Sequence, residues 1–301
     1  MIENAQVECY LCESTNLSIS QNHKKVHYQG QTYTFFKCKD CCSYSIFPKL
    51  DLKTLSEMYS SKYSTISVDA PVENLKNYSL KFLELEKYLI SESSAQATTF
   101  LDIGCGFNPV TLQIARNLGY EVHGVEYSKD VVDEANTRNF GPVMEINAFK
   151  LTSTRYDYIF MGDVIEHFVN PISELKETQK RVLEGGFLIA QGPLQGALTI
   201  SHILVNLKSR LSRGEVSSFP PYHVSLATRH GMLAIIESAD FEIVKMRITE
   251  KDWPAPTFKL LTENFTLRRL TIFLIKLADK IISSLLPNYG SHYFLVAKKK
   301  N

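Results

Sequence analysis

The chain has 301 residues, of which 44% are hydrophobic and 22% are charged. This length and composition predict one large domain with a buried core and a small second one, and they exclude a disordered chain or a disulfide-stapled mini-protein. With 33 basic and 32 acidic residues, the net charge of +1 creates no overall positive field of the kind that attracts nucleic acid. We therefore expect no nucleic-acid partner.

The N-terminal sequence, MIENAQVECYLCE, has acidic residues where a secretory signal would have basic ones followed by an apolar run. Nowhere does the chain contain the roughly 18 consecutive apolar residues that a membrane-spanning helix needs. We therefore expect a cytoplasmic protein. In a reducing cytosol, clustered cysteines bind metal more often than they form disulfides.

Five of the six cysteines lie within the first 42 residues. Cys9 and Cys12 form one C-x-x-C pair, and Cys38 and Cys41 form a second. Each pair can present two thiolates to a tetrahedral ion across a tight turn, and four soft ligands with no open position favour structural zinc. The alternatives are ordinary reduced thiols, or a site in which Cys42 replaces Cys41.

The segments around this cysteine module suggest three domains. Between the two pairs, loosely alternating apolar residues around Gln29-Gly30 predict a hairpin. Apolar spacing then predicts a short helix starting near Asp51 and an amphipathic helix over 72–90. The predicted boundaries are residues 1–50 for a zinc ribbon, 51–98 for a helical connector, and 99–301 for the main domain.

The main domain opens with a β-prone run, Thr99 to Ile103, followed by the glycine loop Gly104-Cys105-Gly106-Phe107-Asn108-Pro109 and a helical pattern. A strand, a glycine turn and a helix are typical of the nucleotide-binding start of a doubly wound sheet. A second strand ends at Glu126, at the spacing where a carboxylate accepts both hydroxyls of a ribose. Pro109 stands where the dinucleotide motif needs a glycine, which disfavours a pyrophosphate ligand.

Four segments, in this order, resemble the motifs of class I S-adenosylmethionine-dependent methyltransferases of the ubiquinone-biosynthesis-like branch. They are Leu101–Gly106, Val125–Ser128, Tyr156–His167 and Glu184–Ile189. The cysteine module fits this resemblance, because bacterial members of the branch often carry such a ribbon. One departure is Asn108, where many relatives have a third glycine. We expect Asn108 to cap the next helix, with Pro109 at its first position.

The resemblance implies a three-layer, doubly wound α/β fold with a seven-stranded sheet whose last strand is antiparallel. Asp102, Gly104 and Gly106 would shape the pocket for the methionine part of S-adenosylmethionine, and Glu126 would hold its ribose. Asn147 and Ala148 would lie against adenine, after a third strand at Val143 to Ile146. The full set of implied cofactor residues is Asp102, Gly104, Cys105, Gly106, Glu126, Tyr127, Asn147, Ala148, Asp163, Val164 and His167. The simpler alternatives are an ordinary glycine turn and a solvated acid near a helix end.

Two histidines are candidate catalytic bases, because imidazole can accept a proton near neutral pH. His167 follows the fourth strand, at the carboxyl edge where open α/β sheets bind ligands. His223 lies in a segment that, by the resemblance, faces the acceptor and precedes a helix predicted from Arg229 to Ala239 with Thr228 as its N-cap. Alternatively, His167 only orients its loop or contacts the cofactor, and His223 is an ordinary loop histidine.

Two helical segments lie outside the shared motifs. A helical insertion at about 194–219 could form a lid over the acceptor or pack on the core. A second amphipathic helix is predicted at 266–286, within a C-terminal segment, 254–301, that has eight basic and two acidic residues. This helix could cover the sheet, form a homodimer contact, or make weak contact with an anionic membrane surface.

These observations together predict methyl transfer from S-adenosylmethionine to a small molecule, at a hydroxyl of a sugar, polysaccharide precursor or secondary metabolite. One alternative is carbon or nitrogen methylation of a nucleotide-linked sugar, and another is a non-catalytic scaffold with a decayed cofactor pocket. Nucleic-acid methylation is disfavoured, because Gly162-Asp163-Val164-Ile165 stands where such enzymes carry Asn/Asp-Pro-Pro-Tyr/Phe. The fold alone does not determine the acceptor.

Overall fold

The computed structural model describes residues 7–21, 23, 25–51, 54, 58, 82–92, 98–196, 199–211, 216–217, 221–250 and 265–300. The chain divides into two compact units. Their segments are Met1–Pro48, Gly192–Ile235 and Lys245–Leu295 in the first unit, and Lys49–Gln191, Ile236–Val244 and Val296–Asn301 in the second.

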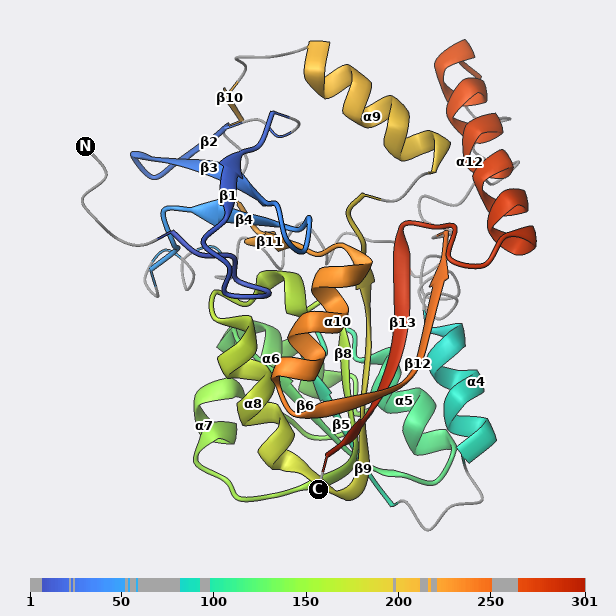
Figure 1. Ribbon diagram of the computed structural model, residues 1–301. Helices are drawn as coiled ribbons and strands as arrows, with labels where there is room; N and C mark the ends of the chain where they lie inside the picture. Colours follow the sequence, from blue (N-terminus) through green and yellow to red (C-terminus); the bar gives the residue numbers. More distant parts are fainter. Residues whose placement is uncertain are drawn as a thin grey trace. The chain divides into compact units, whose positions relative to one another are not determined.

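The first unit contains a six-stranded sheet in the order β10-β2-β3-β4-β11, with β1 paired to β3 (Figure 1). Its strands are β1 (Leu17–Ile19), β2 (Lys25–Tyr28), β3 (Gln31–Cys38), β4 (Tyr44–Phe47), β10 (Val216–Ser217) and β11 (Ser225–Leu226). The turn between β2 and β3 consists of Gln29 and Gly30, with φ of 48° and 76°. Two central residues with positive φ are typical of a tight hairpin turn, so the predicted hairpin is confirmed.

A segment distant in sequence completes this sheet. Strand β11 pairs antiparallel with β4, and the amide of Ile46 donates to the carbonyl of Val224 at 3.0 Å. Helix α10 (Arg229–Ser238) follows directly. The Thr228 hydroxyl accepts from the amide of Gly231 at 3.2 Å and donates to the carbonyl of Cys41 at 2.6 Å. Thr228 is therefore the N-cap of α10, as predicted, and also a tie to the cysteine module.

The larger sheet has seven strands in the order β12-β13-β9-β8-β5-β6-β7. These strands are β5 (Thr99–Ile103), β6 (Glu121–Glu126), β7 (Val143–Glu145), β8 (Tyr156–Gly162), β9 (Val182–Pro193), β12 (Phe241–Thr249) and β13 (His292–Lys299). Strands β5 to β9 pair in parallel, and the last pair is antiparallel, which confirms the predicted sheet. The third strand ends at Glu145, one residue earlier than expected, because helix α7 begins at Ile146.

Helices pack against the parallel strands of this sheet. They are α4 (Leu83–Glu92), α5 (Val110–Asn117), α6 (Lys129–Thr137), α7 (Ile146–Lys150) and α8 (Pro171–Arg181). Helix α5 contacts β5 and β6, and α6 contacts β6 and β7. Along β8 the residues from Tyr158 to Met161 are all buried, as expected for a parallel strand covered on both faces.

The predicted connector is only partly described. Helix α4 covers the end of the helix expected over 72–90 and continues to Glu92, while residues 72–81 lie outside the described residues. Of the helix expected near Asp51, only Thr54 and Met58 are described, both helical, and the Asp51 carboxylate accepts from the amide of Thr54 at 2.7 Å.

Two further helices belong to the first unit. Helix α9 (Ile200–Leu211) lies in the segment predicted as a helical insertion, and α12 (Leu267–Leu285) in the segment predicted as a basic amphipathic helix. Thr266 caps α12 by accepting from the amide of Arg269 at 3.2 Å. Among the described residues, none of the helices combines the length and the hydrophobicity that crossing a bilayer requires.

Candidate active site

The strand order creates a switch point at β5. This strand lies between β6, which follows it in the chain, and β8, on the opposite side. Open α/β sheets bind their ligands outside the carboxyl ends of the strands at such a point, because the loops from the two strands diverge there. The glycine loop follows β5, Glu126 ends β6, and Asp163 follows β8. The sequence-predicted cofactor residues of these three strands therefore meet at one edge of the sheet.

The glycine loop turns sharply after β5. Gly104 and Gly106 have φ of 74° and 72°, a region that residues with a side chain rarely occupy. The amides of Gly104 and Cys105 both donate to the carbonyl of Val125, at 2.8 and 3.3 Å, which holds the loop against the end of β6. Two glycines are sufficient for this turn, since Asn108 is not among the residues with positive φ.

The expected capping role of Asn108 is wrong. The N-cap position of α5 is occupied by Pro109, and no side chain caps the helix. Asn108 is instead buried, and its backbone carbonyl accepts from the amide of Val110 at 2.8 Å. Asn108, which stands where many relatives have a third glycine, is therefore compatible with this loop. It places an amide side chain inside the protein.

Glu126 connects the end of β6 to the glycine loop. Its carboxylate accepts from the amide of Gly106 at 3.0 Å through Oε2 and from the amide of Tyr127 at 2.6 Å through Oε1. Burial raises the pKa of Glu126, although both amide hydrogen bonds act in the opposite direction. A carboxylate oxygen can accept two hydrogen bonds, so each oxygen keeps the capacity to accept one from a ligand hydroxyl.

The loops after β5 and β8 touch each other. A Cβ atom placed on Gly104 would lie 2.5 Å from Cγ2 of Val164, so only glycine fits there without a shift. Asp163 has a φ of 57°, and its amide donates to the carbonyl of Gln191 at the end of β9 at 2.8 Å. The short 3-10 helix Ile165–His167 follows. This contact brings together two motifs that are about 60 residues apart in the chain.

Asp102 and Cys105 lie on the inner side of the loop. Asp102 is buried and accepts a hydrogen bond from the Thr111 hydroxyl, which links β5 to α5. Burial, with the charges of Asp102 and Glu126 adding to it, raises the pKa of Cys105 well above its usual value. The sulfur packs closely against Gly124, because a Cβ atom added to that glycine would lie only 2.9 Å from it. Cys105 is therefore a neutral packing residue with no sign of thiolate chemistry.

The remaining predicted residues are more exposed or lie elsewhere. Tyr127, Asn147 and Ala148 are exposed at the carboxyl ends of β6 and β7. His167 is half-buried in the second unit, which also contains the glycine loop. His223 is exposed and belongs to the first unit. Sequence reasoning missed the contact between Gly104 and Val164, although an apolar residue directly after the Gly-Asp turn was a signal for it.

The four cysteines of the first unit form a cluster. The sulfurs of Cys9 and Cys41 are 3.6 Å apart and those of Cys12 and Cys38 are 3.7 Å apart, with all four sulfurs within 4.8 Å of one another. A tetrahedral zinc ion with bonds of about 2.3 Å places its sulfurs about 3.8 Å apart, so the cluster fits structural zinc. The hydrogen bond from Cys9 lowers the pKa of Cys41, while the same contact and burial raise the pKa of Cys9, so one thiolate of this pair is favoured and shares the proton of the other.

Cys42 does not take part in the cluster. It is exposed and has a φ of 60°, and the cysteines that could hold a metal ion together are Cys9, Cys12, Cys38 and Cys41. The amide of Cys41 donates to the sulfur of Cys38 at 3.5 Å, a contact that helps to orient the second pair. The residues present therefore fit a closed four-thiolate site with no position open for a substrate.

Comparison with known proteins identifies the family of the chain. Residues 75–246 match a family described as a methyltransferase domain. Over 150 residues the chain is 29% identical to a ubiquinone biosynthesis O-methyltransferase of Candida albicans, covering 46% of this chain and 44% of that protein. The chain thus matches less than half the length of this relative.

Among solved structures, the chain resembles magnesium protoporphyrin IX methyltransferase of Synechocystis PCC 6803, solved with bound S-adenosylhomocysteine. The TM-score is 0.55 at 14% identity, and the match covers 83% of this chain and all of that one, which establishes a shared fold. Because the family match spans more than half of the 301 residues, the chain belongs to the methyltransferase-domain family and has the class I methyltransferase fold.

Proposed function

We propose that this chain transfers a methyl group from S-adenosylmethionine to a hydroxyl of a small molecule: a sugar, a polysaccharide precursor or a secondary metabolite. The observation that carries the proposal is the Glu126 carboxylate, bonded to the amide of Gly106 at the switch point of the sheet. The name of the Candida albicans relative, an O-methyltransferase, supports oxygen as the acceptor atom. The reduced cysteine cluster suits a cytoplasmic location.

The proposed cofactor contacts are those that the family resemblance implies, and the positions of the residues at the switch point support them. Glu126 would accept hydrogen bonds from the ribose hydroxyls, while Gly104 and Gly106 allow the methionine part to approach the backbone. Asp102 accepts a hydrogen bond from Thr111, which joins the strand and the helix on either side of this loop. The exposed residues Tyr127, Asn147 and Ala148 would surround the adenine, and the half-buried residues Asp163, Val164 and His167 would lie near the sulfonium. When bound, S-adenosylmethionine supplies a methyl group on a positively charged sulfur.

The protein itself must align the acceptor and exclude water, because methyl transfer is an in-line displacement at carbon. An acceptor hydroxyl also has to lose its proton. His223 or His167 would take this proton, since an imidazole is unprotonated over a large part of the neutral pH range. The backbone next to His223 is bonded to β4 through Val224 and Ile46, so its segment is held in place.

The first experiment tests cofactor binding. Calorimetric titration of the zinc-loaded protein with S-adenosylhomocysteine should show one site, and Glu126→Gln should weaken binding by about 10- to 100-fold, because hydrogen bonds to a charged acceptor contribute about 1.5–3 kcal/mol. Glu134→Gln, on the exposed face of α6, is the matched control and should leave the affinity unchanged. A folded protein that binds no S-adenosylhomocysteine would contradict the proposal and favour the scaffold alternative.

The second experiment tests chemistry. Methyl-labelled S-adenosylmethionine is incubated with a panel of hydroxylated sugars, nucleotide-linked sugars and phenolic metabolites, and NMR of the product identifies the methylated atom. With the acceptor found, His223→Ala should lower kcat by about 100-fold or more and leave S-adenosylhomocysteine affinity intact. His230→Ala, at an exposed position in the first turn of α10, is its control. Methylation at carbon or nitrogen would overturn the choice of oxygen but not the methyl transfer.

A further inference from the structure

Helix α12 has its polar side turned inward and its apolar side outward. Leu267, Leu274, Ile281 and Leu285 are 53–75% exposed, and their spacing places them along one face of the helix. The opposite face carries Lys276, Asp279 and Ser283, and Asp279 is fully buried. A helix that only covered a protein core would show the reverse arrangement.

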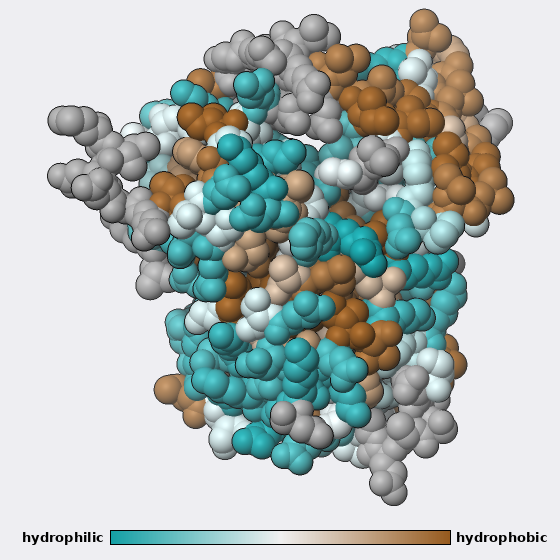
Figure 2. All heavy atoms as spheres, viewed as in Figure 1, coloured by the Kyte–Doolittle hydropathy of each residue, from teal (hydrophilic) through white to brown (hydrophobic). Residues whose placement is uncertain are grey.

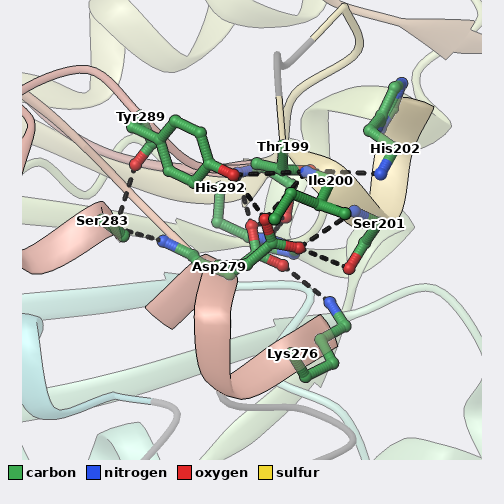
Figure 3. A network of polar contacts seen from close by, with 11 residues as sticks. Thr199, Ile200, Ser201, His202, Lys276, Asp279, Ser283, Tyr289 and His292 are labelled. Carbon is green, nitrogen blue, oxygen red and sulfur yellow. Dashed lines mark hydrogen bonds and ion pairs between the residues drawn. The ribbon is translucent and has the colours of Figure 1, made fainter. Parts of the chain in front are cut away.

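Polar contacts fix this orientation (Figure 3). The Asp279 carboxylate accepts from the amides of Ile200 and Ser201, at 2.8 and 3.0 Å, from the Ser201 hydroxyl at 2.5 Å, and from the Tyr289 hydroxyl. Burial opposes ionisation of Asp279, but these hydrogen bonds outweigh it and lower its pKa. Asp279 is therefore an anion at neutral pH, and it binds the first turn of α9.

A second set of contacts holds the same face of α12. Lys276 forms an ion pair with Glu250 at 2.6 Å. The Ser283 hydroxyl accepts from the amide of Glu250 at 3.0 Å and donates to the carbonyl of Tyr289 at 2.9 Å. Rotating α12 to bury its leucines would break all of these contacts at once. The outward apolar face is thus part of the folded state.

Helix α9 extends the exposed apolar area. Its residues Ile203, Leu204 and Leu207 are also exposed. Figure 2 shows hydrophobic residues gathered over both helices on the same face of this unit, at the positions of α9 and α12 in Figure 1. We call this area the α9–α12 surface: Ile203, Leu204, Leu207, Leu267, Leu274, Leu277, Ile281 and Leu285. Large contiguous apolar patches on a protein surface generally mark an interaction site.

The charges around the α9–α12 surface indicate the partner. The exposed charged residues of α12 are Arg268, Arg269 and Lys280, all basic, and the one acid of the helix, Asp279, is buried. A second copy of this chain would bring the same basic residues against one another, which opposes dimer formation through α12. Anionic lipid headgroups complement them, and long basic side chains can reach headgroups while apolar side chains enter the acyl boundary.

We propose that the α9–α12 surface docks on an anionic lipid bilayer, with α12 lying in the plane of the membrane. The apolar residues enter the boundary between headgroups and acyl chains, and Arg268, Arg269 and Lys280 contact lipid phosphates. The hydrogen bonds of Asp279 keep both helices in the geometry that presents this surface. This proposal is independent of the acceptor.

Vesicle co-sedimentation of the full, zinc-loaded chain tests it. The protein should sediment with vesicles of phosphatidylcholine and phosphatidylglycerol, bind phosphatidylcholine alone at least tenfold more weakly, and be released by high salt, since each basic residue near an anionic surface adds a salt-screened attraction. The double variant Leu274→Glu, Ile281→Glu should lose binding by about tenfold or more. Leu151→Glu, at an exposed leucine of the second unit, is the matched control and should bind normally.

Two further measurements make the result decisive. Thermal unfolding should be unchanged in the double variant, because both positions are exposed, so lost binding is not lost folding. Light scattering of the lipid-free chain should show a monomer. Equal binding to neutral and anionic vesicles, or unaltered binding of the double variant, would overturn the proposal. A lipid-free dimer that the double variant dissociates would overturn it as well, by showing that a second copy covers the surface.

Discussion

At the scale of single residues, the two glycines of the loop share a backbone conformation but have different surroundings. Gly104 and Gly106 both have positive φ, yet a Cβ on Gly104 would meet Val164 while one on Gly106 would find no atom within 4 Å. Gly104 is therefore required both by its backbone conformation and by the lack of room for a side chain. Gly106 is required by its backbone conformation alone. This difference allows the two requirements to be measured separately.

Gly106→Ala should reduce the free energy of unfolding by about 1–2 kcal/mol, the cost of the left-handed conformation for a residue with a side chain. Gly104→Ala should lose about 1–3 kcal/mol more, because overpacking adds to this cost. Urea unfolding measures both. In the Gly104→Ala background, Val164→Ala should recover part of the extra loss. Equal effects of the two glycine substitutions would show that Val164 does not constrain the loop.

The raised pKa of Glu126 leads us to expect that cofactor binding depends on pH. This pKa is raised by burial, and the ionised form is the one that accepts hydrogen bonds from ribose hydroxyls. S-adenosylhomocysteine affinity should therefore be constant at high pH and fall as pH drops through this raised pKa, at a higher pH than for an ordinary glutamate. Calorimetry across pH measures the fall, which should be absent in Glu126→Gln. A wild-type profile as flat as that of the variant would contradict the role of Glu126.

At the scale of elements, the cysteine module supports the segment that carries His223. Strand β11 pairs with β4, and Thr228 donates to the carbonyl of Cys41, one of the four clustered cysteines. The ribbon therefore contributes the strand that β11 pairs with, and the carbonyl that binds the capping residue Thr228, to residues about 180 positions later in the chain. A structural metal in the ribbon would order this segment as well as the ribbon itself.

Removal of zinc with a chelator should accordingly loosen β11 and the start of α10. Hydrogen exchange of the amides of residues 224–231 should speed up, because their partners in β4 and at Cys41 lose order. Amides of β5 and the affinity for S-adenosylhomocysteine should change little, since the proposed cofactor residues lie in other elements. Unchanged exchange at 224–231 in verified metal-free protein would show that the segment holds its structure without the ribbon.

At the scale of the whole molecule, the chain combines a four-cysteine cluster with a methyltransferase sheet, and no residue belongs to both. The proposed zinc ligands come from residues 9–41, and the proposed cofactor residues from 102–167. Two ligand sites that share no residues should stabilise the protein independently, each in proportion to its own binding free energy.

This independence can be tested by unfolding the full chain in four states, with and without zinc and with and without S-adenosylhomocysteine. S-adenosylhomocysteine at about 100 times its dissociation constant should add about 2.7 kcal/mol to the free energy of unfolding. The same increment, within about 0.5 kcal/mol, should appear in the metal-free protein. A difference above about 1 kcal/mol would show that the two sites are energetically coupled.

Much of this architecture follows from local sequence patterns. The C-x-x-C pairs predict their own cluster, because four thiolates at that spacing can meet around one ion. The run Leu101-Asp102-Ile103-Gly104-Cys105-Gly106 predicts a strand and a glycine turn, because only glycine adopts the positive φ of such a turn readily. The position of Glu126 at the same edge of the sheet follows from the lengths of α5 and β6, which lie between it and the glycine loop.

Other features were decided by tertiary structure alone. The pairing of β11 with β4, the contact of Gly104 with Val164, and the burial of Asp279 beneath α9 all join residues that are distant in the chain. An amphipathic pattern such as that of α12 shows that a helix has two faces but not which face turns inward, because hydrogen-bond partners such as Ile200 and Tyr289 compete with hydrophobic burial. The sequence by itself therefore determined the family, the four-cysteine cluster and the glycine loop. Only the packing of distant segments decided what supports His223 and which apolar surface remains open, since those contacts have no local signature.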